Sequence, residues 1–408
     1  MNYQEALELT AKYGQEHLLK YYDELTEDEK TGLLEQIEKL DFSILSVLEH
    51  KEEEAVRGEL APLKAVTIEQ IEKEHDTFYE TGIEAIKAGK IGAVLLAGGQ
   101  GTRLGFDKAK GMYNIGINKD LYIFEQLISN VMKVVEKAGV YIPFYIMTSD
   151  KNNADTVNFF EEHNYFGYDK DYVRFFVQDM APSVDRNGKI YLEGKGKVSL
   201  SPNGNGGWFT SMQKSGVLDD AKKRGVEWLN IFAVDNVLQK IADPLFVGAV
   251  LSKGYISGAK VVHKNAPDER VGVLCTEDGK PSIVEYYEMT KDMTDLRDEN
   301  GDLQYAYGVI LNYLFKIDEL EKIAGEKLQT HFAEKKIPYI DEQGNFIKPE
   351  EPNGYKFETL ILDMIHLFDN CLPYEVVREH EFAPIKNPTG IDSLVSAREL
   401  LKLNGIDF

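Results

Sequence analysis

The stretch LAGGQGTRLGFDKAKG, which ends at Gly111, places glycines and three cations directly after an apolar run. Glycines at the end of a strand let backbone N–H groups approach an anion closely, because no Cβ stands in the way. Arg103, Lys108 and Lys110 add fixed positive charge beside that turn. Such charge suits a reaction in which negative charge grows on phosphate oxygens. These residues therefore predict a phosphate-binding loop that takes part in group transfer.

This loop fits neither of two familiar nucleotide-binding motifs. The run from Gly99 to Gly105 has one residue too many for G-x-G-x-x-G, and no G-x-x-x-x-G-K-[ST] is present. An NAD-dependent oxidoreductase would also need an acidic residue at a strand end about 20 positions further on. A helix over residues 124–137 is expected there instead. The alternative is a tight structural turn with a solvated basic flank. The glycines alone would favour that alternative, whereas Arg103 and Lys110 together with them favour a phosphate-binding loop.

The elements around the loop indicate an α/β fold. Short β-rich runs alternate with helical runs from Lys90 onward, beginning with the apolar run IGAVLLA at residues 91–97. This alternation predicts a mixed, mostly parallel sheet with helices on both faces. Such folds bind ligands at the carboxyl ends of their strands, which is where the glycine-rich loop begins.

Three parts are expected along the chain. Residues 1 to about 88 carry apolar residues at helical spacing and almost no strand-like run, which predicts a helical arm. We interpret the acid run from Glu52 to Glu54 in this arm as a solvated helix face. From about His331 the sequence is loop-rich before the helical run TLILDMIHLFD. The expected parts are an arm (1–88), a catalytic core (89–330) and a C-terminal region (331–408).

Composition and charge limit the possible partners. At 408 residues the chain exceeds what one compact core usually holds. A formal net charge of −23 argues against nucleic acid and anionic lipid, but it allows a local basic pocket for a small polyphosphate. No apolar run approaches the roughly 20 residues of a membrane span. Cys275 and Cys371 stand in unlike contexts, so we expect no disulfide framework, no thiolate metal site, and a reducing, cytoplasmic compartment.

The loop and its continuation KGMYNIG resemble the signature of the UDP-sugar pyrophosphorylases, most closely the UDP-N-acetylglucosamine pyrophosphorylases of eukaryotic type. The resemblance runs collinearly from about residue 91 to residue 392, through FFVQDMAPSV, KVSLSPNGNGGWF, FAVDN, GAKVVHKNAPDERVGVL, IVEYYEM, KKIPYIDEQGNFIKPEEPNGYKFE and EFAPIKN. It implies a GT-A-like nucleotidyltransferase core that converts UTP and a sugar 1-phosphate into a UDP-sugar and pyrophosphate, with Mg²⁺. Because the chain stops shortly after Lys386, we expect a short, bacterial form; the oligomeric state stays open.

The resemblance implies a set of nucleotide-binding residues. The set is Leu96, Ala97, Gly98, Gly99, Gln178 and Gly204. The first four would lie under the uridine and the phosphates. Gln178 would read the uracil edge, because its amide offers both a donor and an acceptor. Gly204 belongs to a turn that would also contact the sugar.

The resemblance also implies the catalytic and metal-binding groups. Arg103 and Lys110 would hold the triphosphate, and Lys386 would fold back from the C-terminal region to the reacting phosphate. Asp235 would bind Mg²⁺, since a hard cation prefers carboxylate oxygen. The alternative for Asp235 is a cap on a following helix, and for Lys386 an exposed loop lysine.

For the sugar, the resemblance implies contacts from Asn205, Gly272 and Glu285. Simple turn chemistry is the alternative for Asn205, and a solvated strand carboxylate is the alternative for Glu285. Glucose-specific relatives resemble the Asn205 segment but with a histidine, so the asparagine favours an N-acetylhexosamine. We therefore expect N-acetylglucosamine 1-phosphate as the substrate, with glucose or galactose 1-phosphate as the alternative.

Four departures from the family pattern affect these expectations. Ala109 replaces a proline beside the loop lysine, which should change loop stiffness more than chemistry. Val309 stands where the family has an asparagine that touches the sugar, and Leu360 and Leu362 replace two aromatics. A non-catalytic nucleotide-sugar-binding protein is the alternative of another class. Such a protein would keep the loop but lose its cations or the metal carboxylate.

Overall fold

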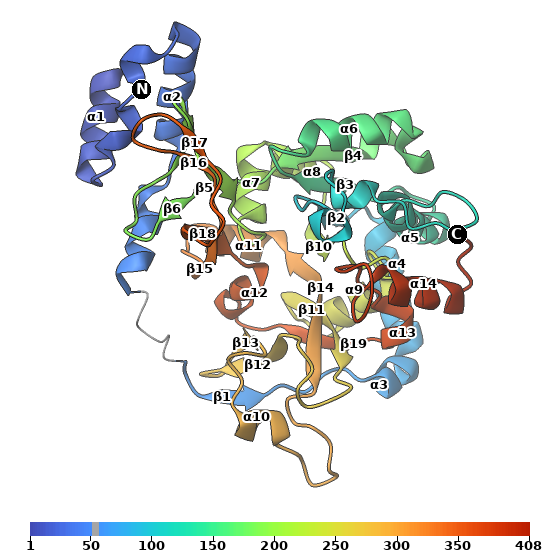
Figure 1. Cartoon of the computed structure of the whole chain (residues 1–408). Coiled ribbons are helices and arrows are strands. Elements are labelled where there is room, and N and C mark those ends of the chain that lie inside the picture. Colours follow the sequence, from blue (N-terminus) through green and yellow to red (C-terminus); the bar gives the residue numbers. More distant parts are fainter. Residues whose placement is uncertain (51–56) are drawn as a thin grey trace. The chain divides into compact units, whose positions relative to one another are not determined.

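The computed structural model describes residues 1–50 and 57–408, and the chain forms two compact units (Figure 1). The smaller unit contains Met1–Val56, Asp179–Gly207 and Lys327–Ile361; the larger contains Arg57–Gln178, Trp208–Glu326 and Leu362–Phe408. The acid run from Glu52 to Glu54, predicted to be a solvated helix face, lies outside the described residues. The boundaries at residues 88 and 330 come from the sequence pattern and not from contacts between residues. The three-part division therefore stays a prediction.

A ten-stranded mixed sheet forms the centre of the larger unit (Figure 1). Its main path runs β1-β12-β14-β10-β2-β3-β4; β11 pairs with β14 and β19, and β13 pairs with β12. The pairs β10–β2, β2–β3 and β3–β4 are parallel, whereas β14 runs antiparallel to β10. The strands are β1 (Leu60–Pro62), β2 (Ile91–Leu96), β3 (Phe144–Thr148), β4 (Val173–Val177), β10 (Trp228–Ala233), β11 (Ser257–His263), β12 (Val273–Glu277), β13 (Lys280–Val284), β14 (Tyr307–Lys316) and β19 (Leu372–Glu375). The expected mixed α/β architecture is confirmed.

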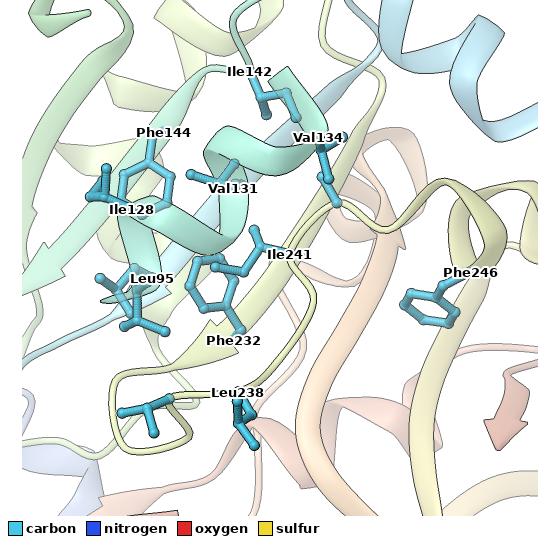
Figure 2. Close-up of a cluster of buried hydrophobic side chains, with 14 of the residues drawn as sticks. Leu95, Ile128, Val131, Val134, Ile142, Phe144, Phe232, Leu238, Ile241 and Phe246 are labelled. Atoms are coloured by element: carbon cyan, nitrogen blue, oxygen red, sulfur yellow. The ribbon is translucent and has the colours of Figure 1, made fainter. Parts of the chain in front are cut away.

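Strand β2 lies inside the parallel part of this sheet. All six of its residues are buried, because β10 and β3 pair with its two edges and both faces are covered. Leu95 of β2 belongs to a buried cluster with Phe144 and Phe232 from the neighbouring strands and with Ile128 and Val131 from helix α5 (Ile123–Ala138) (Figure 2). A strand covered on both faces reads as a continuous apolar run, which is why the sequence predicted it correctly. This packing holds the strand end where the glycine-rich loop begins.

Helices surround the sheet of the larger unit. The expected helix over 124–137 is α5, which begins at Ile123 and ends at Ala138. The other α-helices are α3 (Ile68–Lys73), α4 (His75–Lys87), α6 (Asn153–Glu162), α7 (Trp208–Lys214), α8 (Val217–Lys223), α9 (Pro244–Ser252), α10 (Lys291–Asp295), α11 (Ile317–Ile323), α13 (Arg378–Glu381) and α14 (Leu394–Leu403). Short 3-10 turns are η4 (Thr102–Leu104), η5 (Lys110–Met112), η6 (Asn164–Gly167), η7 (Lys170–Tyr172) and η8 (Ile365–Leu367). Within the described residues, no helix has both the length and the apolarity needed to cross a membrane.

The helices of the predicted arm divide between the two units. Helices α3 and α4 pack in the larger unit, while α1 and α2 belong to the smaller unit. Leu33 and Ile37 of α2 are fully buried in a cluster with Val184 and Phe357, which lie far along the chain. The elements of this N-terminal segment are α1 (Tyr3–Lys12), η1 (Glu16–Leu19), η2 (Tyr22–Glu24), α2 (Glu27–Lys39) and η3 (Phe42–His50). The apolar spacing of the arm therefore marks faces that pack against distant segments.

The region after His331 contains more strands than expected. It forms β15, which pairs along its whole length with β18, and a hairpin of β16 and β17. The strands of the smaller unit are β5 (Met180–Pro182), β6 (Val184–Asp185), β7 (Leu192–Gly194), β8 (Lys197–Val198), β9 (Leu200–Pro202), β15 (Thr330–Lys335), β16 (Tyr339–Ile340), β17 (Phe346–Ile347) and β18 (Gly354–Thr359). The helix expected in TLILDMIHLFD is α12 (Ile361–Met364) followed by η8. The expectation of a loop was wrong because β18 is held by β15 and β6, whose pairing is not visible in the local pattern.

Candidate functional site

The glycine-rich loop starts where β2 ends, and backbone hydrogen bonds close it on itself. Ala97 still donates to Met147 of β3 (2.8 Å), and Asn152 donates its side-chain amide to the Ala97 carbonyl (3.0 Å). Further along, the Gly101 N–H donates to the Lys108 carbonyl (3.0 Å) and the Lys110 N–H to the Gly99 carbonyl (3.1 Å). The loop is thus a closed turn that presents its cations from a fixed backbone.

Gly98 and Gln178 lie directly against one another. Gln178 follows β4, and its N–H donates to Thr148 of β3 at 2.9 Å, so the parallel strands bring it to the edge where the loop begins. A Cβ at Gly98 would overlap the side-chain amide of Gln178. Gln178 is 7% exposed, and its amide makes no hydrogen bond to any of the described residues. Gly98 is therefore required for this close approach, and the amide stays available to a ligand.

Lys110 feels the charges of residues from other segments of the chain. Burial lowers the pKa of the Lys110 ammonium; Lys386 and Arg103 lower it further, while the carboxylates of Asp235 and Asp392 oppose the shift. The three cations predicted to be catalytic therefore share one electrostatic environment with two carboxylates. The cations are Arg103, Lys110 and Lys386, and the carboxylates are those of Asp235 and Asp392. A concentrated positive region of this kind stabilises phosphate charge most strongly where water is partly excluded.

Asp235 comes just after β10 and is joined to the segment that carries Lys386. The Ile385 N–H donates to the Asp235 carbonyl at 2.9 Å. Asn236 donates its side-chain amide to the Glu381 carbonyl (2.7 Å) and accepts from the Ala383 N–H (2.9 Å). These bonds hold the C-terminal segment against the end of β10. They explain how Lys386, about 150 residues further along the chain, reaches the neighbourhood of Asp235.

The helix-cap alternative for Asp235 is wrong. The next helix, α9, begins at Pro244, and its N-cap is Asp243, whose side chain accepts from the Leu245 N–H. Asp235 is half-buried, and its carboxylate makes no hydrogen bond or ion pair within the part of the chain that the structure describes. This carboxylate is therefore free to hold a cation.

The residues present fit a magnesium ion bound mainly through a nucleotide. Across residues 1–50 and 57–408, no group of three or more His, Cys, Asp or Glu side chains could form a complete metal cage. Mg²⁺ is commonly bound by one or two carboxylates together with substrate phosphates and water. Asp235 acts electrostatically on Lys110 and is joined to the segment of Lys386, so it supplies one such carboxylate beside cations that suit phosphates.

Asp392 is a member of this cluster that the sequence reasoning missed. Its carboxylate accepts from the Lys386 ammonium at 2.9 Å, and its carbonyl accepts from the Lys386 N–H at 2.6 Å. Lys386 is thus not a freely exposed loop lysine. The only signal in the sequence was an acid six positions after Lys386, in the turn NPTGID.

A second cluster in the larger unit contains two of the residues predicted to contact sugar. A Cβ at Gly272 would lie 3.6 Å from the Glu285 carboxylate, so the two residues are neighbours. The Gly272 carbonyl accepts from the Val309 N–H of β14 at 2.9 Å. The Glu285 N–H donates to the Glu288 carboxylate (2.9 Å), which Arg57 also binds (2.8 Å). Gly272, Glu285 and Val309 therefore lie together on anchored backbone.

Gly204 and Asn205 belong to the smaller unit, so the contacts within the larger unit do not include them. Gly204 has a φ of +74°, and a Cβ there would overlap the Thr359 carbonyl oxygen. The Asn205 side-chain oxygen accepts from the Ile361 N–H at 2.9 Å. This side-chain oxygen of Asn205 therefore takes part in a hydrogen bond that shapes the turn, as the alternative of simple turn chemistry predicted.

A cavity of the larger unit lies apart from the charged cluster. A cavity of about 420 Å³ in the larger unit is lined by residues that include Lys133, Lys240, Tyr374 and His380, but by none of the predicted site residues. The cluster is recognised by its charges and by the backbone hydrogen bonds that hold them, and concentrated positive charge attracts a polyanion.

Comparisons with known proteins find relatives that match most of the chain. A model of the family described as UTP–glucose-1-phosphate uridylyltransferase matches residues 42–405. The chain is 37% identical over 413 residues to human UDP-N-acetylhexosamine pyrophosphorylase-like protein 1, covering 95% of this chain and 82% of that protein. It is 36% identical over 425 residues to Arabidopsis thaliana UDP-N-acetylglucosamine diphosphorylase 2, covering 98% and 83% respectively.

A solved structure is similar over almost the whole chain. It is the uridine diphosphate N-acetylglucosamine pyrophosphorylase from Trypanosoma brucei in complex with an inhibitor. The TM-score is 0.83 at 27% sequence identity, with 97% of this chain and 83% of that chain covered. The similarity in fold therefore includes both compact units and extends well beyond the loop.

Proposed function

The chain belongs to the UTP–glucose-1-phosphate uridylyltransferase family and is a nucleotidyltransferase, and we propose that it forms UDP-N-acetylglucosamine and pyrophosphate from UTP and N-acetylglucosamine 1-phosphate. The observation that carries the proposal is the cluster of Arg103, Lys110 and Lys386 beside the Asp235 carboxylate. The names of the similar human and Arabidopsis proteins support an N-acetylhexosamine. A non-catalytic binding protein would have no need to keep all four groups.

In the proposed reaction an oxygen of the sugar phosphate attacks the α-phosphorus of UTP, and pyrophosphate leaves from the opposite side. The phosphate monoester is already largely ionised at pH 7, so no general base is needed. Arg103 and Lys110 neutralise triphosphate charge, and Lys386 stabilises charge at the reacting phosphate. Catalysis then consists of positioning and electrostatic stabilisation, as in other phosphoryl-group transfers.

Gln178 provides base recognition in this proposal. Its amide, held against Gly98 and without a partner among the described residues, can donate to and accept from the uracil edge. A cytosine presents a donor where uracil presents an acceptor. The amide can rotate to match either base, so Gln178 alone gives only part of the selectivity.

Asp235 would hold Mg²⁺ together with phosphate oxygens of the nucleotide. The ion would supply neutralisation of the charge that develops on the departing pyrophosphate. The proposal also includes a reducing, cytoplasmic compartment. In support, Cys275 and Cys371 are free and buried, and burial raises the pKa of each thiol to about 12, which leaves both thiols unreactive.

The sugar is tested by a panel of sugar 1-phosphates. Purified protein is incubated with Mg²⁺, each of the four nucleoside triphosphates, and N-acetylglucosamine, N-acetylgalactosamine, glucose or galactose 1-phosphate, and pyrophosphate release is measured. We expect the highest kcat/KM with UTP and N-acetylglucosamine 1-phosphate. Preference for glucose or galactose 1-phosphate would transfer the assignment to that sugar. UTP binding without pyrophosphate release from any pair would indicate a non-catalytic binding protein.

A further inference from the structure

Lys386 is held by two separate contacts with one residue. The Asp392 carboxylate accepts from the Lys386 ammonium at 2.9 Å, while the Asp392 carbonyl accepts from the N–H groups of Lys386 (2.6 Å) and Asn387 (3.1 Å). The ion pair is partly open to solvent: the exposed side-chain fractions are 42% for Lys386 and 29% for Asp392. A ligand can therefore reach the ammonium without unfolding the segment.

The turn that presents Asp392 has an unusual backbone. Asp392 has a φ of +52°, a left-handed conformation that, apart from glycine, asparagine and aspartate adopt more readily than other residues. The turn is closed by the Leu394 N–H, which donates to the Asn387 carbonyl at 2.9 Å, and by Ser393, which caps α14. These hydrogen bonds hold the left-handed turn, and within it the Asp392 carboxylate points back onto Lys386.

We propose that Asp392 is a positioning residue, which holds the Lys386 ammonium at the site and yields it to the phosphates when the nucleotide binds. The inference rests on the proposed function. Asp392 also contributes negative charge to the environment of Lys110, so it balances part of the charge of Arg103, Lys110 and Lys386. Without substrate, the negative charge of Asp392 lowers the mutual repulsion of these three cations. With substrate, the phosphates replace Asp392 as the partner of Lys386.

This role has a consequence that a merely structural residue would not have. Replacing Asp392 by asparagine keeps the size and the tolerance for left-handed backbone, but it removes the negative charge. The site becomes more positive, so UTP should bind about 3- to 10-fold more tightly, since a tenfold change corresponds to only about 1.4 kcal/mol. Turnover should fall about tenfold or more, because the ammonium is no longer directed and the pyrophosphate product is held more strongly.

The test measures UTP affinity and turnover in matched variants of the full chain. UTP is titrated with Mg²⁺ and without sugar phosphate into wild type, Asp392→Asn, Lys386→Met and the double variant, and pyrophosphate release is then followed. Asp407→Asn is the control, since Asp407 forms an exposed ion pair with Lys119 (3.1 Å) and has no assigned role. We expect tighter UTP binding with lower kcat in Asp392→Asn, and wild-type behaviour in the control. In the Lys386→Met background, Asp392→Asn should lower kcat no further, whereas part of the tighter UTP binding should remain, because the charge of Asp392 also acts on Lys110.

Other outcomes overturn the proposal. Unchanged or weaker UTP binding in Asp392→Asn, or a loss of kcat on that change that persists fully in the Lys386→Met background, would show that Asp392 only shapes the turn. If Asp392→Asn does not fold, Asp392→Gly, which accepts the same φ, replaces it in all titrations. Absence of pyrophosphate release from wild type would reject the proposed function, whereas the UTP titrations would still decide the role of Asp392.

Discussion

Two glycine-rich turns of this chain use glycine for different purposes. In the loop at residues 96–111, Gly98 makes room for the side chain of Gln178, and cations follow it. In the turn at residues 203–206, Gly204 supplies a positive φ and avoids the Thr359 backbone, and the turn itself contains no cation. The flexible side chain next to Gly98 can move to admit a ligand, whereas the backbone carbonyl next to Gly204 cannot. Glycine alone therefore indicates a tight turn, and the neighbouring charges indicate a phosphate site.

The largest effect is expected from the cation at the reacting phosphate. Lys386→Ala should lower kcat by about 10²–10³-fold, the range seen when one preorganised group that stabilises developing charge is removed. UTP should still bind, because Arg103 and Lys110 remain. Steady-state pyrophosphate release combined with calorimetric UTP binding measures the two effects separately. A kcat within a few-fold of wild type would remove Lys386 from the mechanism.

Gly98→Ala tests the turn that is proposed to bind the nucleotide. The new methyl group would displace the Gln178 amide, which is the end of a flexible side chain. We expect KM for UTP to rise about 10-fold or more, the equivalent of losing a hydrogen-bonded contact of about 1.5 kcal/mol. The melting temperature should change little. A lower melting temperature with unchanged KM would mean that Gly98 serves the fold only.

Gly204→Ala tests the other turn and should affect stability first. The substitution forces a left-handed φ on alanine and places its methyl group against the Thr359 carbonyl, which cannot rotate away. The free energy of unfolding should fall by about 1–3 kcal/mol. Denaturant unfolding followed by circular dichroism measures this loss. Unfolding at the wild-type midpoint would contradict the backbone role assigned to Gly204.

The pH dependence of UTP binding should report Lys110. Burial lowers the pKa of this ammonium, so it loses its proton at a lower pH than an exposed lysine, whose pKa is about 10.4. The charged form binds phosphate, and UTP affinity should therefore fall as pH rises through that lowered pKa. Lys110→Arg should abolish the fall, since arginine stays charged. An identical alkaline profile in both proteins would assign the titration to another group.

The smallest effect is expected at the third cation of the loop. Lys108 is exposed, and it is not among the main charges that perturb Lys110. Lys108→Ala should change kcat/KM by no more than about 2-fold, because an exposed charge is screened by solvent and salt. Kinetics at low and moderate salt provide the measurement. A tenfold loss would extend the phosphate site to the whole basic flank of the loop.

Much of the larger unit could be predicted because its signals are local. The run at residues 91–97 is apolar throughout, and α5 has a clear helical period, so both were placed to within a residue or two. The strands of the region after His331 were missed, since their pairing depends on partners elsewhere in the chain. Each of the two compact units combines three segments that are separate in the sequence. The local pattern does not show which segments pack together, so this division was missed as well.

The candidate site was predicted unevenly for a related reason. Arg103 and Lys110 stand within one short loop, so their types and spacing already indicated phosphate chemistry. Asp235 and Lys386 were proposed only through the resemblance to a family. Asp392 was not proposed at all, because its part depends on a left-handed turn that aims its carboxylate at Lys386.

By itself the sequence determined the buried strand and the glycine-rich loop with its cations, and it predicted a polyphosphate as their ligand, since residues close in the chain carry these features. The tertiary structure alone decided which distant charges surround Lys110. Parallel strands bring Gln178 to the loop, and the hydrogen bonds of Asn236 and Ile385 bring Lys386 to Asp235. Electrostatic interaction depends on distance in space and on burial, and neither quantity exists until the chain is folded.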